Sequence, residues 1–338
     1  MRPDLGSVQA FRCVTGGGSG KGPMTLILTP SVKDLTQAAA LLRQGLLVAF
    51  PTETVYGLGG DACSDAAVAG IYAAKGRPSF NPLIVHVSDV TVARRFAMFD
   101  AVADTLAAAF WPGPMTLVLP LRDDAGLSAL VTAGLPTVAL RVPAHPVAQA
   151  LLAAFGGPLA APSANPSGRV SPTRAAHVVD GLAGRIAAVV DGGACAVGVE
   201  STIVGVGDGA VRLLRPGGLA VEVIEAVLGK PLVMMTDPVR PLAPGQLASH
   251  YAPSAALRLG VTQPDTGEVW IGFGPGGGML NLSPAGDLDE AATNLFHSLR
   301  EADRMAGPGG RIAVAPVPEA GLGRAINDRL RRAAAPRG

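Results

Sequence analysis

The stretch LLVAFPTETVYGLG, residues 46–59, joins a short apolar run to a turn that is rich in hydroxyl groups and glycine. The run Leu46–Phe50 is apolar throughout, which predicts a buried strand, and Pro51 ends it. Side chains that follow such a strand lie at the edge of the sheet where open α/β sheets bind ligands. A single turn rich in threonine and glycine is more often only a turn, so this interpretation needs support from elsewhere in the chain.

The same arrangement recurs at other predicted strand ends. Leu159–Ala161 is followed by PSANPSG at 162–168, and the strand predicted over Ala187–Asp191 is followed by two glycines. Further segments of this kind are GVEST at 198–202 and LRPG at 214–217. Oriented hydroxyls, backbone N–H groups and guanidinium groups are what carboxylate and phosphate ligands require. The residues alone therefore predict an α/β enzyme that binds a small anion or a nucleotide.

Two cationic residues and one histidine can be interpreted in more than one way. Lys75 and Arg77 stand at the end of a predicted helix, where they either neutralise the helix C-terminus or hold phosphates. Lys75 is one of only four lysines, against 23 arginines. His86 lies near the end of an apolar strand, where a lone histidine is usually a satisfied core residue.

Short runs of Val, Leu and Ile alternate with alanine-rich stretches over most of the chain. A helix with Ser64 or Asp65 as its cap is predicted to run to Lys75, where glycine and proline stop it. Ser171 and Pro172 are predicted to open another helix, as N-cap and first helical residue. Further predicted strands and helices are Leu83–Val87, Val102–Phe110, Met115–Pro120, Thr137–Arg141, Pro146–Phe155, Thr202–Val206, Val211–Leu214 and Val221–Leu228. This alternation predicts an α/β fold around one twisted sheet with some antiparallel pairing.

The composition changes along the chain and predicts four segments. Residues 1–24 are glycine-rich and predict a flexible leader, and residues 25–229 form the first domain. Residues 230–254 hold many prolines and predict an extended connector, and residues 255–338 form a smaller α/β domain. The strands and helices predicted in that domain are Leu257–Leu259, Val269–Phe273, Asp287–Met305, Ile312–Ala315 and Glu319–Arg332.

Composition and charge exclude several classes of protein. The chain has 338 residues, of which 49% are hydrophobic and 16% are charged, so a large core is expected. A net charge of +1 and only 4% aromatic residues argue against strong nucleic-acid binding. The three cysteines form no CxxC pair, which argues against a zinc site or a disulfide framework.

Two segments invite interpretations that their residues do not support. The glycine-rich run at 16–22 differs from a phosphate-binding loop because Thr15 replaces the first glycine and Gly22 replaces the hydroxyl residue. The apolar stretch Ala101–Leu121 is interrupted by Asp104 and two prolines, so it is not expected to span a membrane. We expect a soluble, cytoplasmic protein.

Eight segments resemble, in order, those of the YrdC-like family, the threonylcarbamoyl-AMP synthases. They are PTETVYGLG (51–59), KGRPSFNPLIVHV (75–87), WPGPMTLVL (111–119), VALRVPAHP (138–146), APSANPSG (161–168), SPT (171–173), GVEST (198–202) and LRPG (214–217). The segments APG (243–245), HYAP (250–253) and GLGRAIN (321–327) resemble the longer, two-domain branch, so the resemblance covers residues 26–335. It implies a YrdC-like twisted, open, mixed sheet with flanking helices, and a smaller Rossmann-like α/β C-terminal domain.

The resemblance also implies roles for particular residues. L-Threonine would be held by Thr54, His86, Arg141, the backbone of Ala161, and Ser201. ATP would be held by Arg77, Asn81, Thr137, Ser163, Ser171, Arg215 and Tyr251. The catalytic candidates, which would touch the phosphates or the carbamate, are Lys75, Arg77 and Asn165.

The activity that the resemblance implies is synthesis of L-threonylcarbamoyl-AMP from L-threonine, bicarbonate-derived CO₂ and ATP, with release of pyrophosphate. This is the first step of the threonylcarbamoyladenosine modification of tRNA, and a separate transferase would take the product. Mg²⁺ would accompany ATP, with unknown protein ligands, and no organic cofactor is expected.

Two other functions remain as alternatives. A carbamoyl-adenylate-forming maturation enzyme has a related domain, but it brings an acylphosphatase region and CxxC pairs that this chain lacks. A non-catalytic RNA-binding module would use a basic cleft, against which the near-neutral charge argues.

Overall fold

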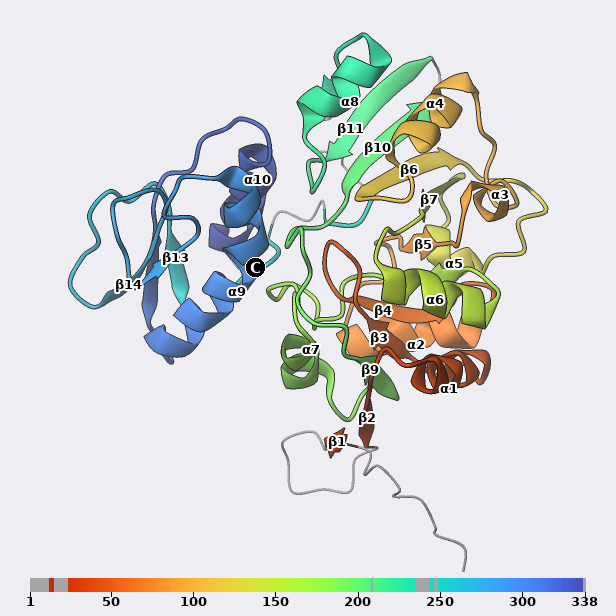
Figure 1. The fold of residues 1–338 in the computed structure, drawn as a ribbon, viewed down its shortest axis with the longest axis horizontal. Helices are drawn as coiled ribbons and strands as arrows, with labels where there is room; N and C mark the ends of the chain where they lie inside the picture. Colours follow the sequence, from red (N-terminus) through yellow and green to blue (C-terminus); the bar gives the residue numbers. More distant parts are fainter. Residues whose placement is uncertain (1–11, 15–23, 208, 235–242, 246–248, 337–338) are drawn as a thin grey trace, which may run out of the picture.

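The computed structural model describes residues 12–14, 24–207, 209–234, 243–245 and 249–336. The glycine-rich run at 16–22 lies outside them, as do most of the predicted leader and part of the predicted connector. The predicted α/β class is confirmed: one large mixed sheet carries helices, and a small parallel sheet forms a second domain (Figure 1).

The first domain is built on a sheet of twelve strands within the described residues. In order across the sheet they are β1 (Arg12–Val14), β2 (Thr25–Leu28), β9 (Ala188–Val190), β3 (Val48–Phe50), β4 (Gly57–Asp61), β8 (Leu159–Ala160), β5 (Ile84–His86), β7 (Thr137–Arg141), β6 (Met115–Pro120), β10 (Thr202–Gly207), β11 (Ala210–Arg215) and β12 (Val233–Met234). The sheet holds both parallel pairs, such as β5 with β7, and antiparallel pairs, such as β6 with β7, which confirms the predicted antiparallel pairing.

Helices cover both faces of this sheet, and each face has its own cluster of buried apolar side chains. On one face α1 (Val32–Arg43) and α6 (Pro146–Phe155) pack together over β2, β3, β8 and β9. The larger cluster on the other face includes residues from α2 (Asp65–Lys75), α4 (Ala101–Phe110), α7 (Ala175–Leu182) and α8 (Val221–Leu228). The short helices α3 (Val90–Ala93) and α5 (Ala129–Thr132) lie in connections.

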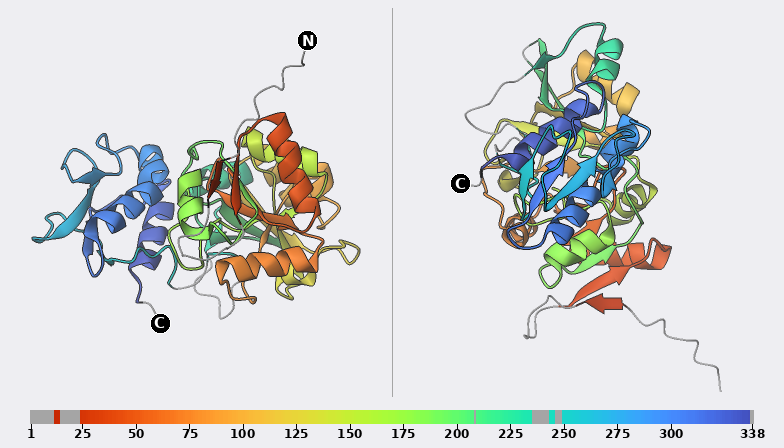
Figure 2. Two further views of the ribbon diagram at one scale, coloured as in Figure 1. Left: turned by 90° about the horizontal axis from the view of Figure 1, so that it is seen from below. Right: turned by 90° about the vertical axis from the view of Figure 1, so that its left-hand side faces the viewer.

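The second domain is a four-stranded parallel sheet with two long helices. Its strands, in order, are β13 (Ala256–Arg258), β16 (Arg311–Val314), β14 (Glu268–Gly272) and β15 (Leu280–Asn281). The helices α9 (Leu288–Ala306) and α10 (Gly323–Ala334) lie on the side that faces the first domain (Figure 1). Figure 2 shows that the second domain lies at one end of the first.

The helix predicted after Ser64 forms as expected. The Ser64 hydroxyl accepts a hydrogen bond from the Ala67 N–H, which caps α2. The helix ends at Gly76, whose φ of 60° lies in the left-handed region that glycine adopts without strain.

The prediction that a helix begins at Ser171 is wrong. α7 begins only at Ala175, and no side chain caps it. The Ser171 hydroxyl donates instead to the Glu200 carboxylate at 2.5 Å, and the Pro172 carbonyl accepts a hydrogen bond from the Tyr56 N–H. Tertiary partners therefore hold residues 171–173 outside the helix.

The turn predicted after Pro51 also continues into a strand that the sequence did not predict. β4 pairs antiparallel with β3, and Gly57 lies opposite Phe50. A Cβ atom on Gly59 would come within 2.8 Å of the Phe50 ring, so glycine lets the strand pass beneath that ring. Glycine has a low strand propensity, so packing determines this element.

Candidate active site

The ends of several strands of the first domain surround one small cavity. Nine of the residues to which the sequence assigned roles line it, and they come from segments up to 197 positions apart. They are Thr54, Arg77, His86, Arg141, Ala161, Ser163, Ser201, Arg215 and Tyr251. The cavity measures about 40 Å³, and residues of the predicted connector, Pro244, Gly245 and His250, close part of its wall.

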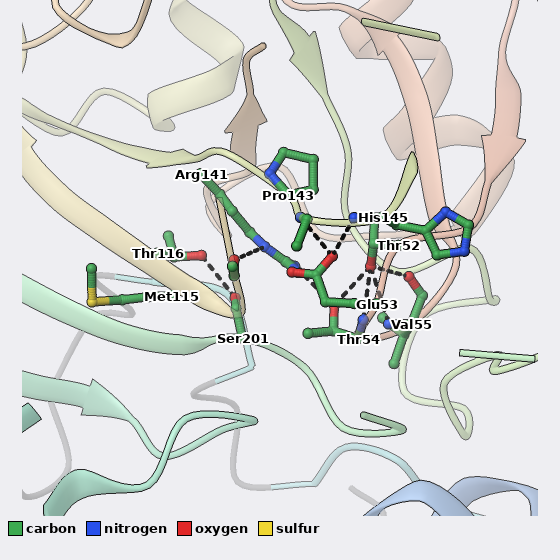
Figure 3. A network of polar contacts seen from close by, with 12 residues as sticks. Thr52, Glu53, Thr54, Val55, Met115, Thr116, Arg141, Pro143, His145 and Ser201 are labelled. Carbon is green, nitrogen blue, oxygen red and sulfur yellow. Dashed lines mark hydrogen bonds and ion pairs between the residues drawn. The ribbon is translucent and has the colours of Figure 1, made fainter. Parts of the chain in front are cut away.

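Arg141, at the end of β7, is the centre of a polar network at this cavity (Figure 3). Its Nη1 donates to Thr54 Oγ1 at 2.8 Å, its Nη2 to Glu53 Oε1 at 2.6 Å, and its Nε to the Gly113 carbonyl at 3.2 Å. Among the described residues these bonds use three of the five N–H groups of the guanidinium, so two are left for a ligand. The arrangement suits recognition of a carboxylate.

Glu53 received no role from the sequence, although it lies inside the segment that decides the fold. Its second carboxylate oxygen accepts hydrogen bonds from the backbone N–H groups of Ala144 and His145, at 3.0 and 3.3 Å. Burial opposes its ionisation, but the charge and hydrogen bond of Arg141 outweigh burial and lower the pKa of Glu53. Glu53 is therefore ionised near pH 7, and its hydrogen bond fixes the orientation of Arg141.

Ser201 links the sheet to a second guanidinium. Its hydroxyl lies 2.7 Å from that of Thr116 in β6, as Figure 3 shows. Arg215, at the end of β11, donates from Nη2 to the Ser201 carbonyl at 2.8 Å, and from Nη1 to the Pro244 carbonyl at 3.1 Å. Arg215 thus contacts both the first domain and the connector.

Arg77 and Lys75 are buried cations that order the loops around them. Arg77 donates to the carbonyls of Asn81 and Pro82 at 3.3 and 2.9 Å. The Lys75 ammonium donates to the carbonyls of Ser163 and Asn165, each at 2.5 Å. Burial and the nearby charge of Arg77 lower the pKa of Lys75 well below its ordinary value.

Five of the predicted site residues do not line the cavity. Lys75 is bonded to the carbonyls of Ser163 and Asn165, and Ser171 is bonded to Glu200. Thr137 begins β7, about 13 Å along the strand from Arg141, which ends it. Asn81 is buried, and within the described part of the chain neither atom of its amide has a hydrogen-bond partner. Buried amides without a partner are rare in folded proteins, so this one is unusual.

Three further polar residues belong to the site or stand beside it. Glu200 and His250 line the cavity, and the buried Arg329 of α10 donates to Glu200 at 3.0 Å. Both lining residues lie within segments that the sequence singled out, GVEST and HYAP, but nothing in either segment distinguishes them. Arg329 lies 129 positions from Glu200 and gives no local signal.

The histidines of the cavity are neutral near pH 7. Burial, with a contribution from the charge of Arg141, lowers the pKa of His86 to about 3. Burial and the surrounding cations lower the pKa of His250. Both imidazoles are thus suited to hydrogen bonding rather than to accepting a proton.

Neither a metal cage nor a membrane span is found in the described residues. No group of three or more His, Cys, Asp and Glu side chains there could hold a metal ion. Glu53 and Glu200 each pair with an arginine. No helix of the described part is long and apolar enough to cross a bilayer.

Comparison with known proteins places the chain in a family. A family model described as telomere recombination matches residues 40–217, and one described as the C-terminal domain of threonylcarbamoyl-AMP synthase matches residues 219–335. The threonylcarbamoyl-AMP synthase of Bacillus subtilis is 43% identical, covering 91% of this chain and 94% of the relative, and that of Pyrococcus abyssi is 41% identical, covering 88% and 92%. The crystal structure of P. abyssi Sua5 complexed with L-threonine superposes with a TM-score of 0.84 and 38% identity, covering 92% and 98% of the two chains. The chain therefore belongs to the threonylcarbamoyl-AMP synthase family, in the form that carries the C-terminal domain.

Proposed function

We propose that this chain synthesises L-threonylcarbamoyl-AMP from L-threonine, CO₂ derived from bicarbonate, and ATP, and releases pyrophosphate. The observation that carries the proposal is that Arg141, Arg77 and Arg215 line one cavity. Arg141 is oriented to receive a carboxylate, and the other two guanidiniums suit a polyphosphate. The named activity and the threonine complex of the relatives support the same assignment.

The reaction needs positioning and charge neutralisation more than covalent catalysis. The neutral threonine nitrogen forms a bond to the carbon of CO₂ and loses a proton, which gives a carbamate. A carbamate oxygen then attacks the α-phosphorus in line, and the bond to the β-phosphate oxygen breaks as pyrophosphate leaves. Arg141 would hold the threonine carboxylate, and Arg77 and Arg215 would offset charge on the phosphates.

A magnesium ion would enter with ATP. The site offers no acidic cluster in its described residues, which fits an ion held by phosphate oxygens and water. The ion would supply charge neutralisation at the phosphates. Lys75 and Asn165 would act by shaping the loop that carries Ser163, through the bonds of Lys75 to its carbonyls.

The same proposal implies where the product goes and in which compartment the protein works. The product is a reactive adenylate, which would pass to a separate transferase acting on tRNA. The protein would work in the cytoplasm, where tRNA and ATP are present.

The proposal is tested by pyrophosphate release, with each of the three substrates omitted in turn. We expect release only when threonine, bicarbonate and ATP are all present. Arg77→Ala should abolish release while circular dichroism and the melting temperature show a folded protein. Release without threonine, or normal turnover in folded Arg77→Ala, would contradict the proposal and the role of Arg77 respectively.

A further inference from the structure

Arg329 is the most deeply buried charge that the second domain directs at the first. Its side chain on α10 is 0% exposed. It donates from Nε to Glu200 Oε2 at 3.0 Å and from Nη1 to the Pro216 carbonyl at 2.5 Å. Its guanidinium carbon also lies 5.4 Å from the centre of the Tyr251 ring. One side chain thus contacts both a cavity-lining carboxylate and a cavity-lining residue of the connector.

Glu200 stands where a polyphosphate would be held. It lines the cavity beside Arg215, and its other carboxylate oxygen accepts the Ser171 hydroxyl at 2.5 Å. Burial opposes its ionisation, but the charges of Arg329 and Arg215 outweigh burial and lower the pKa of Glu200. Without Arg329, this carboxylate would repel the phosphates, because like charges are poorly screened in a buried site.

We propose that Arg329 is a positioning residue for ATP, through which the second domain neutralises Glu200 and holds Tyr251 against the cavity. This inference rests on the proposed function in one respect, that the ligand is ATP. It assigns the second domain a direct part in nucleotide binding. A purely structural role would instead make Arg329 one of several contacts that join the domains.

The two interpretations are separated by measuring binding of ATP with Mg²⁺, and separately of L-threonine, by calorimetry. Arg329→Met should weaken ATP binding at least tenfold and threonine binding less than threefold. The double variant Arg329→Met/Glu200→Gln should recover most of the lost ATP affinity, because it removes the uncompensated charge. Such recovery is a coupling energy between the two side chains, which a loss of packing would not produce.

A matched control lies on the same helix. Arg324 forms an ion pair with Glu222 of α8 at 3.0 Å, and both side chains are more than 40% exposed. Arg324→Met therefore removes an arginine of α10 and a contact between domains without touching the cavity. We expect its ATP affinity to equal that of the unmodified protein.

Arg329→Lys gives a second test should Arg329→Met fail to fold. Lysine keeps the positive charge beside Glu200 but lacks the planar group that also holds the Pro216 carbonyl. ATP affinity in Arg329→Lys should fall less than threefold, because the charge that offsets Glu200 remains. A tenfold loss in folded Arg329→Lys would show that this charge is not what Arg329 supplies, which would overturn the inference.

Other outcomes also decide the matter. Unchanged ATP affinity in Arg329→Met, or equal losses of ATP and threonine that Glu200→Gln does not restore, would overturn the role of Arg329. Dependence of ATP binding on Arg329 in a protein that releases no pyrophosphate would contradict the proposed function alone. Failure of the unmodified protein to bind ATP would overturn both.

Discussion

Arg141 is oriented by the protein itself, through an ion pair that is almost completely shielded from water. The exposed fractions of the Arg141 and Glu53 side chains are 4% and 12%. Glu53 is in turn fixed by two backbone N–H groups at the start of α6. A carboxylate ligand of Arg141 therefore meets a guanidinium whose entropy of ordering is already lost.

We predict that Glu53→Gln raises the KM for threonine about tenfold or more and changes the KM for ATP less. A hydrogen bond between charged groups contributes about 1.5–3 kcal/mol, and its loss lets Arg141 turn away from the productive orientation. Steady-state pyrophosphate release measures both constants. Asp124→Asn, which breaks the exposed Arg122 pair, is the control and should behave as the unmodified protein. An unchanged KM for threonine in Glu53→Gln would show that Glu53 does not orient Arg141.

The buried His86 makes stability depend on pH. Because its pKa is about 3 in the folded protein and about 6.5 when unfolded, only the unfolded chain binds its proton between these values. Stability is full above pH 6.5 and falls as the pH drops towards 3, by about 1.4 kcal/mol per pH unit from this residue. At pH 5 this residue lowers the free energy of unfolding by about 2 kcal/mol relative to pH 6.5.

His86→Gln should remove the contribution of His86, so the free energy of unfolding should fall less steeply as the pH drops. Urea unfolding at pH 7.5, 6.5 and 5.5 measures the slope in both proteins. His145→Gln is the control, because His145 is half-buried and only its smaller shift is lost. Equal slopes for His86→Gln and the unmodified protein would mean that His86 does not resist protonation.

At the scale of the element, local signals predicted more than long-range ones. The start and end of α2 followed from Ser64 and Gly76, because caps act within one turn. β4 was not predicted, and the helix start predicted at Ser171 was wrong, because contacts with the Phe50 ring and the Glu200 carboxylate determine these segments. The pairing of Glu53 with Arg141 was not predicted either, because the two residues lie 88 positions apart in the sequence.

Residues of the predicted connector line the cavity and narrow it. A cavity of about 40 Å³ has room for roughly three water molecules. Tyr251 and His250, 1% and 5% exposed, occupy the side next to Arg215 and Gly245. We predict that the segment that carries these residues acts as a lid, which opens to admit nucleotide and closes over it.

Gly245→Ala should disturb this lid. Gly245 has a φ of +83°, and a Cβ atom there would lie 2.7 Å from the Tyr251 hydroxyl and 3.0 Å from Arg215 Nη1. We expect weaker ATP binding, by about tenfold, because Tyr251 and Arg215 must shift. Gly229→Ala is the control: its φ is +64°, and no atom of the described residues lies within 4 Å of the added Cβ. Equal ATP affinities in the two variants would argue against a lid at this position.

At the scale of the whole molecule, one buried apolar cluster includes residues of both domains. Val55, Val170 and Val199 of the first domain belong to the same buried cluster as Phe296 of α9. The Thr293 hydroxyl donates to the Ala196 carbonyl at 2.7 Å. The sequence predicted a second α/β unit. It did not predict that the helices of this unit would pack against apolar side chains of the first domain and pair with Glu200. That arrangement depends on contacts between segments about 100 to 240 positions apart.

Gly198 lets the two domains approach each other. Its φ is +79°, and a Cβ atom would lie 2.4 Å from the Ala292 carbonyl oxygen and from Thr293 Cα, which are backbone atoms that cannot turn away. Gly193, in the same loop, has a φ of +85°, and an added Cβ there would have no atom within 4 Å in the described part of the chain. The two positions thus share the backbone strain of a substitution and differ in the clash with α9.

Gly193→Ala should lower the free energy of unfolding by about 1–2 kcal/mol, the cost of a left-handed alanine. Gly198→Ala should lower it by about 1–3 kcal/mol more, the range for overpacking, and should loosen the second domain. Scanning calorimetry is expected to separate one unfolding transition into two in Gly198→Ala only, and small-angle scattering to show a larger radius of gyration. Because Arg329 then withdraws from Glu200, ATP affinity should fall as well. Equal stability and equal scattering in the two variants would show that the domains do not depend on this approach.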